Sequence, residues 1–217
     1  MNKHWWSETK KIVAIGRNYV AHAHELGNKA PKAPFWFIKP STTLIPSNAN
    51  SELFPGAKET HHEVELGIVI GQKMRNIKKE DTLNYVSGYC LALDMTDRDG
   101  QNNAKDAGKP WTQAKGWDTS CPVSDFIPKD KVADPGNLEL WLSVNGVERQ
   151  RDSTDLMIFG VAELLEAVSK VHTLEPWDIL LTGTPKGVGS CKPGDVIKAG
   201  IEGFVEIEVS IVESTIV

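Results

Sequence analysis

Residues 61–71, HHEVELGIVIG, contain the pattern that decides the fold. Val64 and Leu66 alternate with Glu63 and Glu65, so a strand built from this stretch has one apolar face and one face with two carboxylates. Residues i and i+2 of a strand point the same way, with Cα atoms about 6.6 Å apart. Two carboxylates in this arrangement need protons, a cation or solvent to offset their repulsion.

Short apolar runs broken by glycine and proline predict a protein dominated by strands. We expect strands at residues 11–16, 35–39, 62–71, 86–96, 138–144, 178–183 and 202–212, and helices at about 18–26, 97–107 and 160–172. Because the strands do not alternate regularly with helices, we do not expect a parallel sheet of βαβ units. Asn145-Gly146 predicts a hairpin turn. The sequence therefore predicts a mixed α+β, strand-rich fold.

The composition excludes several classes of function. The chain has 217 residues and a net charge of −5, and it lacks the dense run of Lys and Arg that a nucleic-acid partner requires. No segment approaches the roughly 18 apolar residues of a membrane span, and residues 1–11 lack the apolar core of a signal peptide. Cys90, Cys121 and Cys191 are far apart and predict neither a disulfide framework nor a thiolate zinc site. We therefore expect a cytoplasmic protein that acts on small molecules.

A third carboxylate follows a second apolar run. Asp94 lies near the end of that run in LALDMTDRD, residues 91–99. If the two strands are neighbours, Glu63, Glu65 and Asp94 form a cluster whose oxygen donors suit Mg²⁺ or Mn²⁺. The pattern alone leaves two alternatives. The glutamates could lie on a solvated face, or His61 could complete a mixed histidine and carboxylate site.

Several motifs in one order resemble the fumarylacetoacetate hydrolase family, most closely its small acylpyruvate hydrolase type. They are IGRNYVAHAHELG (15–27), FIKPST (37–42), HHEVELGIVIG (61–71), LALDMTDRD (91–99), WTQAKGWDTSCPVS (111–124) and LLTGTPKGVG (180–189). The resemblance implies a β-roll, or flattened barrel, with short peripheral helices. It also implies a single catalytic domain over residues 1–217, with an N-terminal extension at 1–10, and a homodimer. The extra N-terminal domain of the larger family members is not expected.

The resemblance assigns the carboxylates to a metal. It implies that Glu63, Glu65 and Asp94 hold a divalent cation, Mg²⁺ in most family members, with Mn²⁺ as an alternative. His61 would then have a structural role. Further residues implied to line the substrate site are Arg17, Lys39, Arg98, Gln101, Gly183 and Thr184.

The catalytic groups implied by the resemblance are His22, Glu25 and Lys115. His22 and Glu25 are three residues apart, so on a helix the carboxylate could orient the imidazole, although the spacing also fits a solvated polar helix. Lys115 lies between two tryptophans and could equally be a surface lysine. The family uses a His and Glu dyad in a segment that closes over substrate, together with a catalytic lysine.

These roles predict metal-dependent hydrolysis of a carbon–carbon bond in an acylpyruvate, a 2,4-dioxo acid. Glu25 orients His22, which takes a proton from water, and the hydroxide adds to the distal carbonyl. The products are pyruvate and a carboxylic acid. Alternatives that use a similar 2-oxo acid are decarboxylation or enol–keto tautomerisation of oxaloacetate and isomerisation of hydroxyheptadienedioate. A metal-stabilised binding protein without turnover is a remote alternative from another class.

Overall fold

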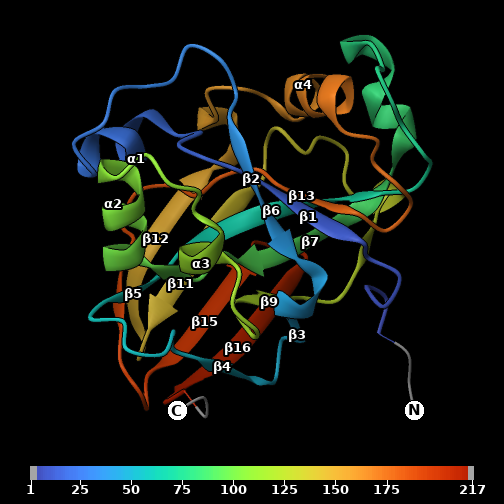
Figure 1. Cartoon of the computed structure of the whole chain (residues 1–217). Coiled ribbons are helices and arrows are strands. Elements are labelled where there is room, and N and C mark those ends of the chain that lie inside the picture. Colours follow the sequence, from blue (N-terminus) through green and yellow to red (C-terminus); the bar gives the residue numbers. More distant parts are fainter. Residues whose placement is uncertain (1–3, 215–217) are drawn as a thin grey trace.

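The computed structural model describes residues 4–214, and within them the strands form three sheets (Figure 1). The central sheet contains β1 (Lys11–Ile15), β2 (Trp36–Pro40), β3 (Leu44–Pro46), β6 (Val64–Ile70), β7 (Val86–Leu93), β9 (Cys121–Val123), β10 (Ile127–Pro128) and β13 (Ile179–Leu181). The second sheet contains β4 (Asn50–Glu52), β11 (Glu139–Val144), β12 (Val147–Ser153), β15 (Val196–Ile201) and β16 (Val205–Val212). A small third sheet joins β5 (Thr60–His62), β8 (Thr96–Asp97) and β14 (Gly189–Cys191).

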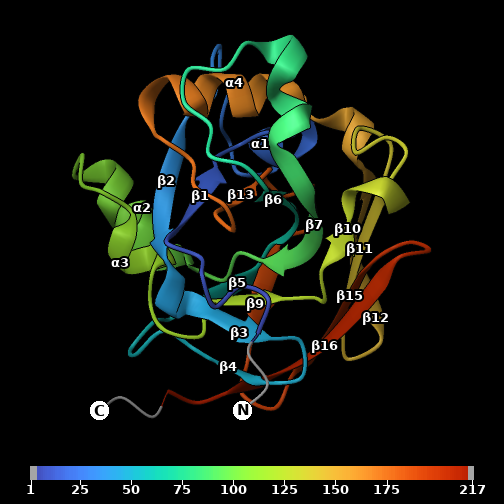
Figure 2. The same cartoon turned by 90° about the vertical axis from the view of Figure 1, so that its right-hand side faces the viewer.

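Short helices lie around these sheets. The α-helices are α1 (Val20–Glu25), α2 (Arg98–Asp106), α3 (Thr112–Lys115) and α4 (Val161–Val171), and 3-10 turns occur at Ser41–Thr43, Lys79–Tyr85, Lys129–Lys131 and Thr154–Leu156. Figure 2 shows α2 and α3 on one side of β1 and β2, with the second sheet on the opposite side and α4 above. No helix between residues 4 and 214 is long and apolar enough to span a membrane.

β6 is buried on both faces, which explains its apolar composition. Val64, Leu66 and Ile68 belong to the main core, which also contains apolar side chains from the second sheet and α4. The alternate residues face the other side, where Val69 belongs to a smaller cluster that also contains residues of β1 and β13. Trp5 packs against this second cluster. The carboxylate face of β6 is therefore not a solvated face.

The predicted fold class is confirmed, because the strands dominate and the central sheet curls into a half-barrel with few short helices. Two predicted strands are each interrupted at a carboxylate. The stretch 62–71 is split at Glu63 between β5 and β6, and the stretch 86–96 is split at Asp94 and Met95 between β7 and β8. No βαβ alternation occurs in the described part of the chain, although β1 and β13, β3 and β9, and β4 and β16 pair in parallel.

The predicted helices are found, with shorter bounds than expected. The range 18–26 contains the six-residue α1, while 97–107 and 160–172 contain α2 and α4. Asn145 and Gly146 both have positive φ and form the predicted turn, between β11 and β12. Of the expected extension at 1–10, residues 1–3 lie outside the described residues, and Trp5 donates a hydrogen bond to the carbonyl of Ser124.

Asp178 ties the first strand to the rest of the central sheet. Its buried carboxylate accepts hydrogen bonds of 2.8 to 3.2 Å from the backbone N–H groups of Lys10, Lys11 and Glu175. It also forms an ion pair with the side chain of Lys11. β1 and β13 pair in parallel immediately after these contacts. Since β1 leads directly to Arg17, this carboxylate supports the segment that enters the candidate site.

We expect Asp178→Ala to lower the free energy of unfolding by about 2–4 kcal/mol, because three backbone N–H groups lose a charged acceptor and Lys11 loses its partner. Urea unfolding followed by circular dichroism measures this loss. The matched control is Asp130→Ala, which removes an exposed carboxylate and should change stability by less than about 0.5 kcal/mol. Equal stability of the two variants would contradict the role of Asp178.

Candidate active site

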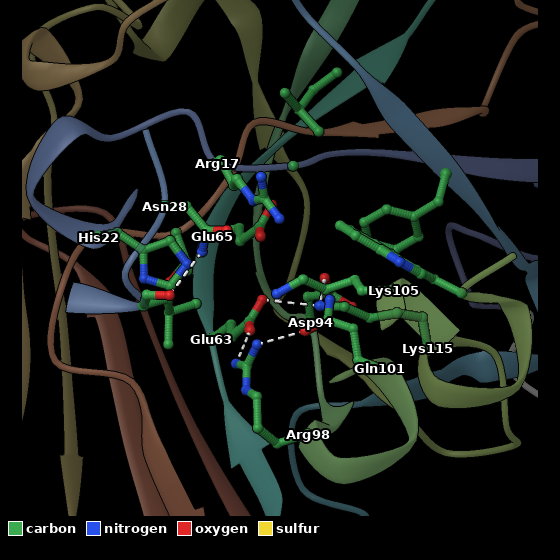
Figure 3. A pocket seen from close by; sticks show the side chains of 16 residues that line it. Arg17, His22, Asn28, Glu63, Glu65, Asp94, Arg98, Gln101, Lys105 and Lys115 are labelled. Atoms are coloured by element: carbon green, nitrogen blue, oxygen red, sulfur yellow. Dashed lines mark hydrogen bonds and ion pairs between the residues drawn. The ribbon is translucent and has the colours of Figure 1, made fainter. Parts of the chain in front are cut away.

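The three carboxylates converge where β6 begins and β7 ends. The two strands are antiparallel, with Glu65 opposite Ala92. The N–H of Asp94 donates to the carbonyl of Glu63 at 2.8 Å, so Glu63 and Asp94 are neighbours across the same pair of strands. One oxygen from each of the three carboxylates lies within 4.8 Å of the others, and all three residues are buried (Figure 3).

Cations from separate elements surround two of these carboxylates. The Nζ of Lys115 donates to Glu63 Oε2 at 2.9 Å and to Asp94 Oδ2 at 2.6 Å. Arg98 pairs with the other oxygen of Glu63, and Lys39 donates to Asp94 Oδ1 at 2.9 Å. Burial lowers the pKa of Lys115, but Asp94 and Glu63 outweigh burial and leave that pKa raised. Burial likewise opposes ionisation of Glu63, yet Lys115 and Arg98 hold its pKa far below the usual range.

Glu65 has a different environment. Its Oε2 accepts a hydrogen bond of 2.7 Å from the N–H of Gly183, and within residues 4–214 no ion pair reaches it. Burial, with the charges of Asp94 and Glu63, raises its pKa well above the ordinary value. An added cation would offset this repulsion. Ligands on one octahedral Mg²⁺ lie about 3.0 to 4.2 Å apart, so small side-chain rotations would bring these oxygens onto a common ion. The donor set therefore fits a hard divalent cation.

Helix α1 carries His22 and Glu25 to the same pocket. His22 Nδ1 lies 3.3 Å from Glu25 Oε2, and the carboxylate of Glu25 accepts from the N–H of Gly187 at 2.9 and 3.2 Å. Burial lowers the pKa of His22, although Glu63 and Glu25 oppose this shift. The imidazole is therefore neutral at neutral pH. With Nδ1 directed to Glu25, Nε2 is the atom that accepts a proton.

A buried asparagine fixes the start of α1. The side chain of Asn18 donates to the carbonyls of Phe159 and Thr182 at 3.0 and 2.9 Å, and it accepts from the N–H of Phe159 at 2.9 Å. Gly183 has φ +94°, and a Cβ there would lie 2.8 Å from the Cβ of Asn18. This close approach holds the segment before α1 beside the residue that donates to Glu65.

Two further cations line the pocket without a carboxylate partner. They are Arg17, whose guanidinium lies 5.7 Å from the ring centroid of Phe35, and Lys105 on α2. In the described range 4–214 neither side chain forms an ion pair. Burial lowers the pKa of Lys105, and the positive charges of Arg17 and Arg98 lower it further. This part of the pocket would therefore favour an anion.

Most residues predicted for the site line one pocket. The pocket is lined by Arg17, His22, Glu63, Glu65, Asp94, Arg98, Gln101, Lys115 and Thr184 (Figure 3). Three predicted residues act on the pocket through a partner. Lys39 pairs with Asp94, the N–H of Gly183 reaches Glu65, and Glu25 contacts His22.

His61 does not join the carboxylates, so the mixed histidine and carboxylate site is not formed. Its Nδ1 accepts from Arg98 Nε at 3.3 Å, and its Nε2 lies 3.1 Å from a carboxylate oxygen of Glu59. His61 therefore helps to orient Arg98, which itself binds Glu63.

Sequence reasoning missed two residues for which a signal existed. Lys105 follows Arg98 and Gln101 at the i, i+3, i+7 spacing of one helix face, and all three line the pocket. Thr96, whose Oγ1 accepts from Lys115 Nζ at 2.6 Å, is two residues beyond the third carboxylate. The helical periodicity and the i+2 spacing could have found both.

Comparisons with known proteins give the family of this chain. The family described as fumarylacetoacetate (FAA) hydrolase C-terminal matches residues 11–212. This chain belongs to that family. A family relative, the oxaloacetate decarboxylase, mitochondrial, of Dictyostelium discoideum, is 53% identical over 205 residues, which cover 94% of each chain. The oxaloacetate tautomerase FAHD1, mitochondrial, of Bos taurus is 47% identical over 204 residues, covering 94% of this chain and 92% of the relative.

A solved structure of the same family has a closely similar fold. The fumarylpyruvate hydrolase from Pseudomonas aeruginosa, in complex with Mn²⁺ and pyruvate, superposes with a TM-score of 0.90 at 36% identity. The match covers 95% of this chain and 91% of that one. The predicted family and its fold are therefore confirmed.

Two expectations from the sequence need correction. Both sequence relatives are named mitochondrial, so the expected cytoplasmic location is wrong. That expectation rested on the absence of a secretory signal and of membrane spans, and neither criterion concerns import into an organelle. The relatives' names also fit the alternatives of oxaloacetate decarboxylation or tautomerisation better than the expected hydrolysis of an acylpyruvate.

We expect Glu65→Gln to separate stability from metal binding. In EDTA at pH 7 the variant should be at least as stable as the wild type. Folding raises the pKa of Glu65, so ionisation of this carboxyl destabilises the folded protein as the pH rises above the pKa of the unfolded state. With Mg²⁺ or Mn²⁺ at about a hundred times its Kd, the wild type should melt roughly 5–10 °C higher, whereas the variant gains little.

Thermal unfolding with and without the metal measures both effects. The matched control is Glu206→Gln, which changes an exposed glutamate on β16 and should respond to the metal as the wild type does. Metal stabilisation of Glu65→Gln equal to that of the wild type would exclude Glu65 as a ligand.

Proposed function

We propose that this protein catalyses the enol–keto interconversion of oxaloacetate with a divalent cation, for which we expect Mg²⁺. The observation that carries this proposal is the pair of cations, Arg17 and Lys105, in the pocket of the three carboxylates. A 2-oxo dicarboxylic acid would place its 2-oxo acid end at the carboxylates and its second carboxylate at this pair. An acylpyruvate with a neutral acyl group has no second anion for them. The names of the relatives support the same substrate.

Separate groups of residues in the site would bind the cation, bind the substrate and transfer protons. Glu63, Glu65 and Asp94 would hold the cation, which when bound would withdraw electron density from the 2-oxo group. Arg17 and Lys105 would bind the distal carboxylate through charge-assisted hydrogen bonds.

His22 and Lys115 provide a base and an acid with opposite pKa shifts. They lie on opposite sides of Glu63 (Figure 3). In the direction from keto to enol, Nε2 of the neutral imidazole takes a proton from C3, and the Lys115 ammonium donates one to the 2-oxo oxygen. The reverse transfers convert the enol to the keto form. Glu25 would hold the imidazole in the tautomer that this reaction needs, because it binds Nδ1.

The same cations favour tautomerisation over decarboxylation. Loss of CO₂ from oxaloacetate requires the negative charge of the distal carboxylate to move towards C3 and the 2-oxo oxygen. Arg17 and Lys105 would stabilise that charge where it starts, which raises the barrier to CO₂ loss. Tautomerisation leaves the distal carboxylate charged throughout, so these cations do not oppose it.

Decarboxylation remains the second candidate, because a relative with 53% identity is named oxaloacetate decarboxylase. It would use the same carboxylates and the same 2-oxo acid end of the substrate. It differs in its product, because pyruvate appears in step with the loss of oxaloacetate.

The experiment that tests this proposal follows enol oxaloacetate by its ultraviolet absorbance with purified protein and Mg²⁺, against EDTA, and measures pyruvate at the end. We expect metal-dependent loss of the enol absorbance without matching pyruvate. Loss with equal pyruvate would replace the proposal with decarboxylation. An unchanged rate would contradict both, and acetylpyruvate would then test the hydrolysis predicted from the sequence.

We expect Lys105→Met to lower kcat/KM for oxaloacetate by roughly 10- to 100-fold, chiefly through KM, because one charge-assisted contact with the distal carboxylate is lost. Inhibition by oxalate should change by less than about threefold, since oxalate has no distal carboxylate beyond the 2-oxo acid end. Steady-state kinetics give both values. Lys109→Met, which changes an exposed lysine outside the pocket, is the matched control. Equal weakening of oxaloacetate and oxalate would contradict the assignment.

The pH dependence should report His22. Burial is the main cause that lowers the pKa of its imidazole below the ordinary value of 6.5. We expect the fall of kcat/KM on acidification to have its midpoint below that ordinary value, because protonation removes the base. Initial rates measured in a constant-ionic-strength buffer series test this. A midpoint above 6.5 would show that His22, with the lowered pKa that burial gives it, is not the base.

A further inference from the structure

Gln150 is a buried amide on a strand that is otherwise largely exposed. It lies on β12 and is 1% exposed, whereas Glu148, Arg149 and Arg151 beside it are exposed. The pairing of β12 with β11 passes from Leu142 opposite Gln150 to Ser143 opposite Glu148, so Arg149 is the extra residue of a β-bulge. Bulges next to functional sites commonly redirect a side chain. Here the bulge lies beside an inward-facing amide.

The amide of Gln150 joins two segments of the candidate site. Its Oε1 accepts from the N–H of Val64 at 3.2 Å and lies 3.1 Å from His62 Nδ1. Its Nε2 donates to Thr184 Oγ1 at 2.8 Å and to the carbonyl of Pro185 at 2.9 Å. Val64 separates Glu63 from Glu65, so one end of the amide binds the segment that carries two of the three carboxylates.

The other end of the amide binds residues 183–187, which we name the latch loop. The latch loop both lines the pocket and contacts α1. The hydroxyl of Thr184 lines the pocket and donates to the carbonyl of Val64 at 2.8 Å, and the N–H of Gly187 donates to Glu25. Gly187 has φ +95°, and a Cβ there would lie 1.9 Å from the carbonyl oxygen of Arg149. β12 therefore contacts the latch loop at Thr184, Pro185 and Gly187.

We propose that Gln150 is a positioning residue that sets the position of α1. By holding the latch loop against the segment of Glu63 and Glu65, it places the Gly187 N–H where Glu25 can bind it. Glu25 in turn orients His22, which lines the same pocket as the carboxylates. The kinetic consequence rests on the proposed function, whereas the effect on α1 does not.

The first test measures hydrogen exchange by mass spectrometry in peptides that cover α1, using Gln150→Met, which has similar length but no amide. The control is Ser169→Ala, which removes another fully buried hydrogen-bonding side chain, on α4, whose hydroxyl bonds to Ile77 and Glu166 and not to the latch loop. We expect exchange in α1 to accelerate by roughly tenfold in Gln150→Met and to remain at the wild-type rate in Ser169→Ala.

Wild-type exchange of α1 in a folded Gln150→Met variant would overturn the proposal. If that variant does not fold, Gln150→Asn, whose side chain is one methylene shorter, is measured in the same way and judged by the same result.

The second test is a double-mutant cycle on kcat/KM for oxaloacetate with Glu25→Gln. If Gln150 acts through Glu25, the double variant should be little slower than the slower single variant. Additive losses would overturn the proposal. A wild-type protein that does not turn over oxaloacetate would refute the proposed function instead, and hydrogen exchange would still decide the role of Gln150.

Discussion

Three buried carboxylates within 4.8 Å of one another are the constraint on which the rest of the site depends. Such a cluster needs protons or positive charge close by. The chain provides it from three separate elements, since Lys39 comes from β2, Arg98 from α2 and Lys115 from α3. Each cation fixes its element against the junction of β6 and β7. The pairing of these cations with the carboxylates therefore also fixes the positions of the elements that line the pocket.

Buried amides complete this arrangement on the side of α1. Asn18 binds the segment after β13 and the residues before α4, and Gln150 binds the latch loop and the start of β6. Both amides have partners for their oxygen and their nitrogen, as buried polar groups require. The helix that carries His22 is thus held at its start and at its end by the segments that also hold Glu65. The same segments therefore position the proposed base, the proposed acid and the three carboxylates.

The parts predicted from the sequence depend on spacing within one segment. The alternation around Glu63 and Glu65, and the i+3 spacing of His22 and Glu25, gave candidate residues, and resemblance to the family chose among their interpretations. Contacts between distant segments could not be predicted in this way. Gln150 lies 86 residues from its partner Val64, on a polar strand with no periodic signal. The breaks in the two long strands were also missed, because apolar residues continue past each carboxylate.

Proton exchange at C3 of oxaloacetate distinguishes tautomerisation by His22 from decarboxylation. Incorporation of deuterium from D₂O at C3 can be followed by proton NMR with Mg²⁺, against EDTA and against His22→Gln. We expect metal-dependent exchange faster than in buffer, absent in His22→Gln, while pyruvate does not accumulate. Exchange at the buffer rate, or loss of the C3 signal only as pyruvate forms, would contradict this expectation.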